Sequence, residues 1–470
     1  MKQIITMKQL ITILMLLFST SSFSQDISGQ WSGTIESKKS DPVVFNFAIE
    51  KKGETYTTTI DIPALRVTNL KPKETTFSNN ALIVDGLNFG FNYQGTFNQN
   101  LQQIEGTFTE GINALPLVLK KLEIQTENSF GRPQEPVKPF PYKEEEVIFE
   151  NRKAGVKLSG TLTSPNTLDK KIPVVILITG SGPQDRDETF NQHKPFLVLS
   201  DYLTRQGIAV LRYDDRGYGK STGDHNLATT KDLASDVLSA IEYLKSREEI
   251  GAIGLIGHSE GAIIAPMVAN PNKNVSFIVM LGGTGIIGSE VSLHLAKKTR
   301  GFPVQDEIAY DVAIRKAIKI ASSNKDLTEI KKELSVHYNE AIKPMLKPLI
   351  NSDAKIEEII NNLIEIRTSL WNRFFYTYNP GNELEKIFCP VLVLNGSKDQ
   401  QVEPKVNQKG IRDALSKGQN KDFTIHELPN LNHLFQECKT CEMDEYSSIE
   451  QTIAPFALQK ILDWITVHIK

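Results

Sequence analysis

The pattern of apolar and polar positions divides the chain into two regions of different character. Between about residues 27 and 122, apolar and polar residues alternate, as in Val43–Ile49 and Tyr56–Ile62, and turn residues separate the short runs. Alternation with a period of two is typical of strands that bury one face. We therefore expect a small all-β domain over residues 27–122, an antiparallel sheet curled into a barrel or a sandwich.

In the second region, residues 145–470, short continuous apolar runs such as Val174–Ile178 and Phe277–Leu281 alternate with segments of helical periodicity. Such runs are typical of parallel strands that are buried on both faces. Two further strands, about Glu146–Asn151 and Lys157–Thr163, are expected to form an antiparallel pair at the start. The pattern predicts an α/β domain with a mainly parallel sheet.

This alternation is interrupted over about residues 285–385. Apolar residues recur there at helical spacing, as in Ile356, Ile359, Ile360 and Leu363. We expect a helical cap inserted into the α/β domain.

The segment that joins the two regions is rich in proline. Gly131–Pro141 contains four prolines at a spacing that neither a helix nor a central strand tolerates. We interpret residues 123–144 as a semi-rigid linker, and we expect a chain that starts near Lys143 to fold without the β-rich domain.

The first residues have the pattern of a signal peptide. Lys2 and Lys8 precede the apolar stretch Leu10–Phe18, and small polar residues follow up to Ser24. The stretch is shorter than the roughly 20 apolar residues of a membrane span. We expect a signal peptide over residues 1–24 with cleavage after Ser24, no stable membrane insertion, and a secreted or periplasmic protein.

Composition and charge narrow the possible partners. The chain has 53 Lys and Arg against 56 Asp and Glu, a formal net charge of −3, and no basic cluster, which argues against nucleic acid as a partner. Asp215–Ser221 ends like a phosphate-binding loop, but Asp214 stands where that pattern requires glycine. We expect a rigid turn instead, with Arg216 and either Asp214 or Asp215 joining neighbouring loops.

Gly257–Gly261, with the sequence Gly-His-Ser-Glu-Gly, is the segment most informative about chemistry. It stands between the predicted strand Ile253–Ile256 and a helix rich in Ala, Ile and Val. Two glycines around Ser259 permit the sharp strand-to-helix turn that exposes a nucleophilic serine. Since a free serine hydroxyl is a weak nucleophile, this interpretation requires a histidine base and a carboxylate that orients the base.

Candidates for the base and the acid lie further along the chain, in the order Ser, acid, His that this kind of turn predicts. His433 follows a Pro-Asn turn, as a loop-borne base would, whereas His426 lies in an alternating run and is expected to be structural. Asp399 follows the apolar run that begins at Pro390. Glu403 is the alternative acid, although the proline after it suggests the start of a helix.

Two backbone amides are expected to stabilise negative charge on a substrate oxygen. One is the N–H of Glu260, directly after the serine; the other is the N–H of Ser181, in the glycine-rich loop after Val174–Ile178, with Gly182 as the fallback. For the Glu260 side chain we favour a stabilising interaction with the helix N-terminus, and attraction of a cationic substrate group is the alternative.

Five segments in the same order carry a family resemblance over residues 145–470: Gly180–Asp187, Leu211–Ser221, Gly257–Gly261, Gly396–Asp399 and Leu431–Gln436. The chain resembles bacterial α/β-hydrolase carboxylesterases of the dienelactone-hydrolase-like and serine-aminopeptidase-like kinds. The resemblance implies an α/β-hydrolase fold, a triad of Ser259, Asp399 and His433, and hydrolysis of short acyl esters. Peptidases occur in the same superfamily.

The sequence therefore favours a secreted serine carboxylesterase that needs no cofactor or metal and acts on a small-molecule ester. A serine peptidase or aminopeptidase acting on small peptides is the alternative. A non-catalytic binding protein on a hydrolase scaffold is disfavoured by the complete triad. Neither the acyl and alcohol groups nor the oligomeric state follows from the sequence.

A signal peptide implies an oxidising compartment, in which two of the three cysteines are expected to pair. Cys438 and Cys441 are expected to form a disulfide close after His433, and Cys389 is expected to be a buried thiol.

Overall fold

The computed structural model divides the chain into two compact units, residues 1–129 and 130–470. It describes residues 26–469 with the exception of 38–39, 54, 63–66, 87–89, 111–112, 122–131, 167–170, 299–302, 351 and 444. The predicted signal peptide lies outside the described residues.

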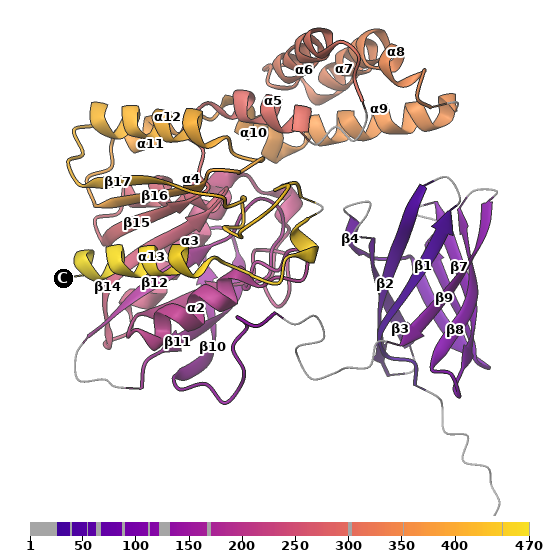
Figure 1. The fold of residues 1–470 in the computed structure, drawn as a ribbon, viewed down its shortest axis with the longest axis horizontal. Helices are drawn as coiled ribbons and strands as arrows, with labels where there is room; N and C mark the ends of the chain where they lie inside the picture. The colour runs from indigo at the N-terminus through magenta and orange to yellow at the C-terminus, as the bar shows by residue number, and fades with distance from the viewer. Residues whose placement is uncertain are drawn as a thin grey trace, which may run out of the picture. The chain divides into compact units, whose positions relative to one another are not determined.

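The first unit is a closed antiparallel barrel, drawn from indigo to purple in Figure 1. Neighbouring strands follow the order β2-β1-β9-β8-β7-β6-β5-β3, and pairing of β3 with β2 closes the ring, while β4 pairs with β3. This confirms the all-β prediction and selects a barrel over a sandwich. The strands are β1 Gly29–Ser37, β2 Ser40–Lys52, β3 Thr55–Ile62, β4 Val67–Leu70, β5 Glu74–Ser78, β6 Ala81–Gly86, β7 Phe91–Asn98, β8 Gln103–Glu110 and β9 Asn113–Lys121.

Aromatic side chains fill the interior of this barrel. Trp31 and Tyr93 are completely buried, and the Tyr93 hydroxyl donates towards the carbonyls of Ile104 and Leu117, 3.1 and 3.2 Å away. Gly95 and Gly106 face each other across β7 and β8, and a Cβ at either would lie 2.7 or 2.5 Å from that hydroxyl. The recurring glycines therefore make room for a buried tyrosine.

The second unit contains an eight-stranded sheet in the order β10-β11-β13-β12-β14-β15-β16-β17. β11 is antiparallel to both its neighbours, and the other pairs are parallel. This order and direction confirm the α/β-hydrolase fold. The strands are β10 Lys143–Asn151, β11 Val156–Ser164, β12 Ile172–Ile178, β13 Ala209–Tyr213, β14 Ile250–His258, β15 Val275–Leu281, β16 Val391–Gly396 and β17 Phe423–Leu428.

Helices cover both faces of this sheet, because consecutive apolar side chains of each strand point to opposite sides. Ile176 of β12 belongs to the apolar core under α3 (Thr230–Lys245), α4 (Gly261–Ala269) and α12 (Pro404–Lys417). Leu177 belongs to the core under α2 (Pro195–Arg205) and α13 (Pro455–His468). Burial on both faces explains the continuous apolar runs of the sequence.

Between β15 and β16 the chain forms a group of helices with its own apolar core. Arg367 is buried in this core, where its guanidinium donates to the hydroxyls of Tyr338 and Tyr376, 3.3 and 3.1 Å away. Figure 1 shows α6 to α9 as a layer beyond α5 and α10. The helices are α5 Gly288–Lys298, α6 Glu307–Ala321, α7 Leu327–Ala341, α8 Lys343–Leu346, α9 Asp353–Thr368, α10 Leu370–Thr377 and α11 Gly381–Leu384.

Part of the proline-rich segment is bound to the second unit. Arg132 is buried and donates to the carbonyls of Ile449 and Ser447, the latter at 2.8 Å. Gln134 Oε1 accepts from the amides of Thr452 and Ile453, 2.6 and 3.0 Å away. Residues 132–142 therefore do not act simply as a spacer.

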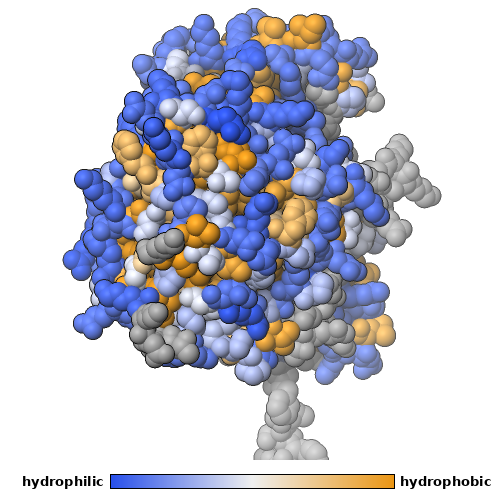
Figure 2. Space-filling view, turned by 60° about the vertical axis from the view of Figure 1, so that its left-hand side comes forward, coloured by the Kyte–Doolittle hydropathy of each residue, from blue (hydrophilic) through white to orange (hydrophobic). Residues whose placement is uncertain are grey.

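The outer surface carries both apolar and hydrophilic side chains. Figure 2 shows apolar patches between hydrophilic side chains on one face. Ile308 and Val312 of α6 are among the exposed apolar residues. Of the helices in the described ranges, none has the length and apolar character that crossing a membrane would require.

Candidate active site

Ser259 lies in a sharp turn between β14 and α4. Its φ of 53° is in the left-handed region, which costs free energy for a residue with a side chain and often marks functional positions. A Cβ at Gly257 would lie 2.0 Å from the carbonyl oxygen of Gly261, and a Cβ at Gly261 would lie 2.0 Å from that of Ile178. Only glycine fits at both positions, which explains the Gly-x-Ser-x-Gly pattern.

Asp399 and His433 form a buried pair, with Asp399 Oδ2 2.7 Å from His433 Nδ1. Asp399 lies in the loop after β16, and its Oδ1 accepts from the amides of Gln401 and Val402, 2.8 and 2.9 Å away. Because an ionised carboxylate only accepts hydrogen bonds, Nδ1 carries a proton. In the neutral ring, Nε2 is then the nitrogen available as a base.

Polar contacts within its loop fix His433. Asn432 Oδ1 accepts from the amides of Leu434 and Gln436, each 3.0 Å away. A Cβ at Gly282, which has a φ of +60°, would lie 3.0 Å from His433 Cε1, so the chain after β15 also limits the position of the ring. The imidazole is therefore held before any substrate binds.

Glu403 and His426, which the sequence left as lesser candidates, have other contacts. Glu403 caps α12, where its carboxylate accepts from the amides of Lys405 and Val406, 3.2 and 2.7 Å away. His426 lies within β17. The structure therefore brings Asp399, and not Glu403, to His433.

A cavity of about 330 Å³ contains both Ser259 and His433. Much of its wall is apolar and comes from α4, α5 and α10 as well as from loops. Among the described residues, Ser259 Oγ has no hydrogen-bond partner, so the hydrogen bond from Ser259 Oγ to His433 Nε2 is not formed. Hydrogen bonds between a catalytic nucleophile and its base often form fully only in the substrate complex. The apolar lining residues are Phe190, Ile263, Val291, Leu295, Trp371, Phe375, Val402 and Leu434.

Ser181 and Glu260, the two predicted oxyanion donors, both line this cavity. Within the described part of the chain, neither of their backbone N–H groups has a hydrogen-bond partner. Gly182, the fallback, is not among the described residues that line the cavity. The two amides therefore remain free to bind a negatively charged oxygen.

Sequence reasoning missed the contacts of two buried residues next to the triad, Glu188 and His258. Glu188 Oε1 lies 2.7 Å from the amide of Gly180 and 2.9 Å from His258 Nδ1, and His258 Nε2 lies 3.0 Å from the carbonyl oxygen of His433. Burial alone would lower the pKa of His258, but the charge and hydrogen bond of Glu188, the His433 carbonyl and the charge of Asp399 raise it. Since both ring nitrogens face acceptors, the arrangement fits a doubly protonated imidazolium.

The Glu260 side chain turns towards the cap. Its Oε1 accepts from the Thr230 hydroxyl and from the Trp371 indole N–H, each 2.6 Å away, and it makes no capping hydrogen bond to α4. Burial raises the pKa of Glu260, although hydrogen bonds from Thr230, Trp371 and Ser181 act in the opposite direction. The predicted role at the helix N-terminus is therefore not what fixes this side chain.

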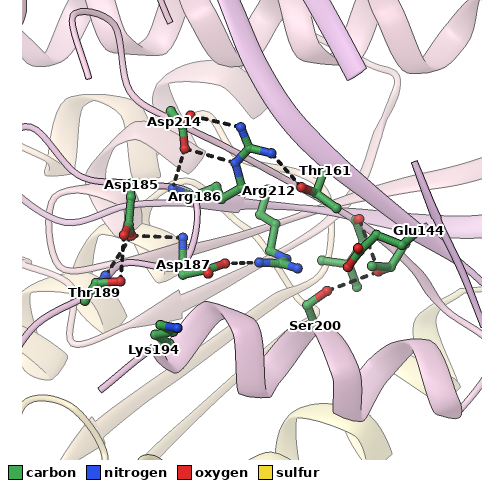
Figure 3. A network of polar contacts seen from close by, with 12 residues as sticks. Glu144, Thr161, Asp185, Arg186, Asp187, Thr189, Lys194, Ser200, Arg212 and Asp214 are labelled. Atoms are coloured by element: carbon green, nitrogen blue, oxygen red, sulfur yellow. Dashed lines mark hydrogen bonds and ion pairs between the residues drawn. The ribbon is translucent and has the colours of Figure 1, made fainter. Parts of the chain in front are cut away.

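The loop after β13 joins neighbouring loops, as expected, but through separate partners. Asp215 accepts from Thr179 Oγ1 and from the amide of Gln184, and Arg216 binds Asp236. Figure 3 shows Asp214 bound to Arg186 through two nitrogens, with the shorter contact at 2.9 Å.

Further polar contacts of the loop after β12 lie next to the Arg186–Asp214 pair. Arg212, which is buried, binds Asp187, and Asp185 accepts from Thr189 (Figure 3). The end of the segment Gly180–Asp187 is thus fixed by two ion pairs, Arg186 with Asp214 and Asp187 with Arg212.

Cys438 and Cys441 are joined in a disulfide shortly after His433. Cys389 is half-buried rather than fully buried, and burial raises the pKa of its thiol to about 11. In the parts of the chain that the structure describes, no group of three or more His, Cys, Asp or Glu side chains could hold a metal ion.

The sheet order together with the serine turn defines the class of this protein as an α/β-hydrolase. Residues 193–437 match the model of the Hydrolase_4 family, described as serine aminopeptidase, S33. The chain belongs to this family.

Two curated relatives are similar over part of their length. Esterase EstD of Thermotoga maritima is 25% identical over 301 residues, which cover 63% of this chain and 61% of EstD. An acyl transferase of Photobacterium phosphoreum is 27% identical over 149 residues, 31% of this chain and 45% of the relative. The chain thus spans about three fifths or less of the curated relatives that it matches.

Among solved structures, an esterase of Pyrococcus furiosus is similar with a TM-score of 0.44 and 15% identity, over 70% of this chain and 92% of that chain.

Proposed function

We propose that this protein is a carboxylesterase that cleaves short acyl esters through an acyl-enzyme. The observation that carries the proposal is the Asp399–His433 pair, 2.7 Å apart, whose histidine lines the same cavity as a serine in a strained turn. The esterase among its relatives supports ester chemistry.

In the first half-reaction, Ser259 Oγ attacks the ester carbonyl carbon while His433 Nε2 takes the hydroxyl proton. The carbonyl π-electron pair moves to the oxygen, which the amides of Ser181 and Glu260 stabilise. When the carbonyl reforms, the bond to the alcohol oxygen breaks and His433 donates its proton to that oxygen. Ser259 then carries the acyl group.

In the second half-reaction, a water molecule gives a proton to His433 and attacks the acyl carbon. The tetrahedral intermediate collapses, the bond to Ser259 Oγ breaks, and His433 returns the proton to Ser259. The acid leaves. Asp399 stays ionised throughout, because its role is to orient the imidazole and stabilise the imidazolium.

A serine aminopeptidase is the second candidate, since this is how the matched family is described. Peptide cleavage would use the same three residues but would require protonation of a poorer leaving group. Parallel assays on 4-nitrophenyl acyl esters and on aminoacyl 4-nitroanilides separate the two. We expect turnover of the esters and little or none of the anilides; the reverse preference would favour the peptidase.

We also propose secretion, on the basis of the predicted signal peptide over residues 1–24. Mass measurement of the protein exported by a bacterial host is expected to show a chain that starts at Gln25. A cytoplasmic protein that retains Met1–Ser24 would contradict this.

A further inference from the structure

Two residues that line the cavity each have a buried polar atom without a partner. Glu260 Oε2 and Thr284 Oγ1 are buried without a hydrogen bond to any described residue, and both residues line the cavity. The exposed fractions of the two residues are 2% and 4%. A buried polar group without a partner costs free energy, so such groups at a binding site suggest that the ligand supplies the partner.

Glu260 cannot easily turn Oε2 away from this position. Its Oε1 is bound by Thr230 and Trp371, from the start of α3 and from α10, so the plane of the carboxyl group is set by two elements. The Ser181 hydroxyl lies close enough to favour the charged form, but its geometry is not that of a hydrogen bond to Oε2. In its ionised form Oε2 accepts a hydrogen bond, and in its protonated form the group can also donate one.

Thr284 lies in the tightly packed segment after β15. Gly285, next to it, donates its amide to Asn407 Oδ1 at 3.0 Å, and Gly282, two residues before it, lies against His433. Thr284 therefore lies on a closely packed backbone, two residues from a glycine that contacts the catalytic histidine. A hydroxyl can both donate and accept, so it can bind a group of either kind.

We propose that the acyl part of the substrate carries a hydroxyl group close to its carbonyl, and that Glu260 Oε2 and Thr284 Oγ1 bind this hydroxyl. The proposal rests on the proposed esterase function. The Glu260 amide is the group that would hold the carbonyl oxygen, so the side chain of the same residue starts beside the acyl group.

An ammonium group is the other donor that a carboxylate could bind, and an amino ester in the test distinguishes it from a hydroxyl. His258, which also lines the cavity, faces acceptors on both ring nitrogens, an arrangement that fits an imidazolium and would disfavour a second cation beside it. Glu188 is already occupied by His258 and by the amide of Gly180. A neutral hydroxyl avoids this repulsion and satisfies both orphaned oxygens.

The test compares kcat/KM of the full chain for 4-nitrophenyl esters of butyrate, 2-hydroxybutyrate, 3-hydroxybutyrate and 2-aminobutyrate. We expect at least one hydroxy ester to exceed butyrate by about tenfold or more, because a site built to bind a hydroxyl disfavours the analogue without it. Thr284→Val keeps the shape and removes the hydroxyl, and Glu260→Gln replaces the carboxyl oxygen with an amide. Each is expected to lower the ratio of hydroxy ester to butyrate by about tenfold.

Ser323→Ala is the matched control, because Ser323 Oγ is also buried without a partner among the described residues but lies in the cap and not in the cavity wall. It is expected to leave the ratio unchanged. Equal turnover of butyrate and hydroxybutyrate, a preference for the amino ester, or an unchanged ratio in both variants would overturn the inference alone. Failure to hydrolyse any of the four esters would instead overturn the proposed function, and this inference with it.

Discussion

At the scale of single residues, the chemistry depends on three side chains whose positions are fixed before substrate binds. Ser259 is held by the strained turn, Asp399 by two backbone amides, and His433 by Asp399 and the contacts of Asn432. Such preorganisation removes part of the entropic cost of reaching the transition state.

The triad gives the first prediction. Ser259→Ala and His433→Ala should each lower kcat by several orders of magnitude, and Asp399→Asn by roughly 10⁴-fold, because the three residues act as a unit. Circular dichroism should show an unchanged fold. Glu403→Gln is the matched control: it weakens the cap of α12 by about 1 kcal/mol but should leave kcat near the wild-type value. Normal turnover in Asp399→Asn together with loss in Glu403→Gln would reverse the assignment of the acid.

The pair of Glu188 and His258 gives a pH prediction. The pKa of His258 is raised in the folded chain above its ordinary value of about 6.5. At pH values between the ordinary pKa and the raised pKa, the native state therefore binds more protons than the unfolded state. The contribution of the pair to stability is therefore complete below about pH 6.5 and is lost as the pH rises through the raised pKa.

Urea unfolding of the wild type and of Glu188→Gln at a series of pH values measures this directly. The difference in free energy of unfolding should be largest at acidic pH and should shrink at alkaline pH. Glu427→Gln, at an exposed position of β17, is the control and should show no such trend. A difference that is constant with pH, or one that grows as the pH rises, would contradict a charged His258.

At the scale of elements, the serine turn is the most constrained feature. In Gly261→Ala the new methyl group would lie 2.0 Å from the carbonyl oxygen of Ile178, so the helix and the strand must separate. We expect a loss of about 3 kcal/mol or more in the free energy of unfolding. In Gly251→Ala, at the start of the same strand β14, the nearest atom to the new methyl group is Lys171 Cβ at 3.3 Å, and the nearest backbone atoms lie 3.5 Å away, so the change should cost less than about 1 kcal/mol. Similar thermal midpoints for the two variants would be inconsistent with this geometry.

Much of the fold can be predicted from the sequence, because the spacing of apolar residues along the chain reflects which faces of an element are buried. The run Phe277–Leu281 becomes β15, and the run after Pro390 becomes β16, since both are buried on two faces. The same reasoning could not choose between a barrel and a sandwich, because strands alternate in the same way in both. Closure through β2 and β3 is a long-range property of the first unit.

The sequence predicts the residues of the site only where a short local sequence motif identifies them. Ser259 lies in a turn that only glycines permit, and His433 and Asp399 each follow a recognisable segment. Glu188 and His258 are 70 residues apart in the sequence. A polar contact between two such distant residues produces no periodic pattern in the sequence, so it could not be predicted. The partner of Glu260 on the cap, Trp371, is likewise visible only in the folded chain.

At the scale of the whole molecule, the boundary between the two units, at residues 129 and 130, lies within the linker over residues 123–144 that the proline pattern predicts. Arg132 and Gln134 bind the segment 447–453. Ala454, the next residue along the chain, donates its amide to the carbonyl of Phe435, in the loop of the catalytic histidine, at 2.8 Å. Residues 132–134 therefore contribute to the active site indirectly.

Two shortened chains test this boundary. A chain of residues 130–470 should fold and hydrolyse a small activated ester about as well as the full protein. A chain of residues 143–470 loses several buried hydrogen bonds of about 1 kcal/mol each, so its thermal midpoint should be about 5–10 °C lower. Arg132→Met in the full chain should reproduce part of this loss. Equal stability of the two shortened chains would show that residues 130–142 are a spacer after all.

The most direct test of the central claim is covalent labelling with a fluorophosphonate, which reacts only with a serine that its histidine activates. Intact mass spectrometry of the wild type is expected to show the addition of one probe, and peptide mapping should place it on Ser259. Ser259→Ala and His433→Ala should remain unlabelled. An unlabelled wild type, or a label on another serine that persists in Ser259→Ala, would contradict the account.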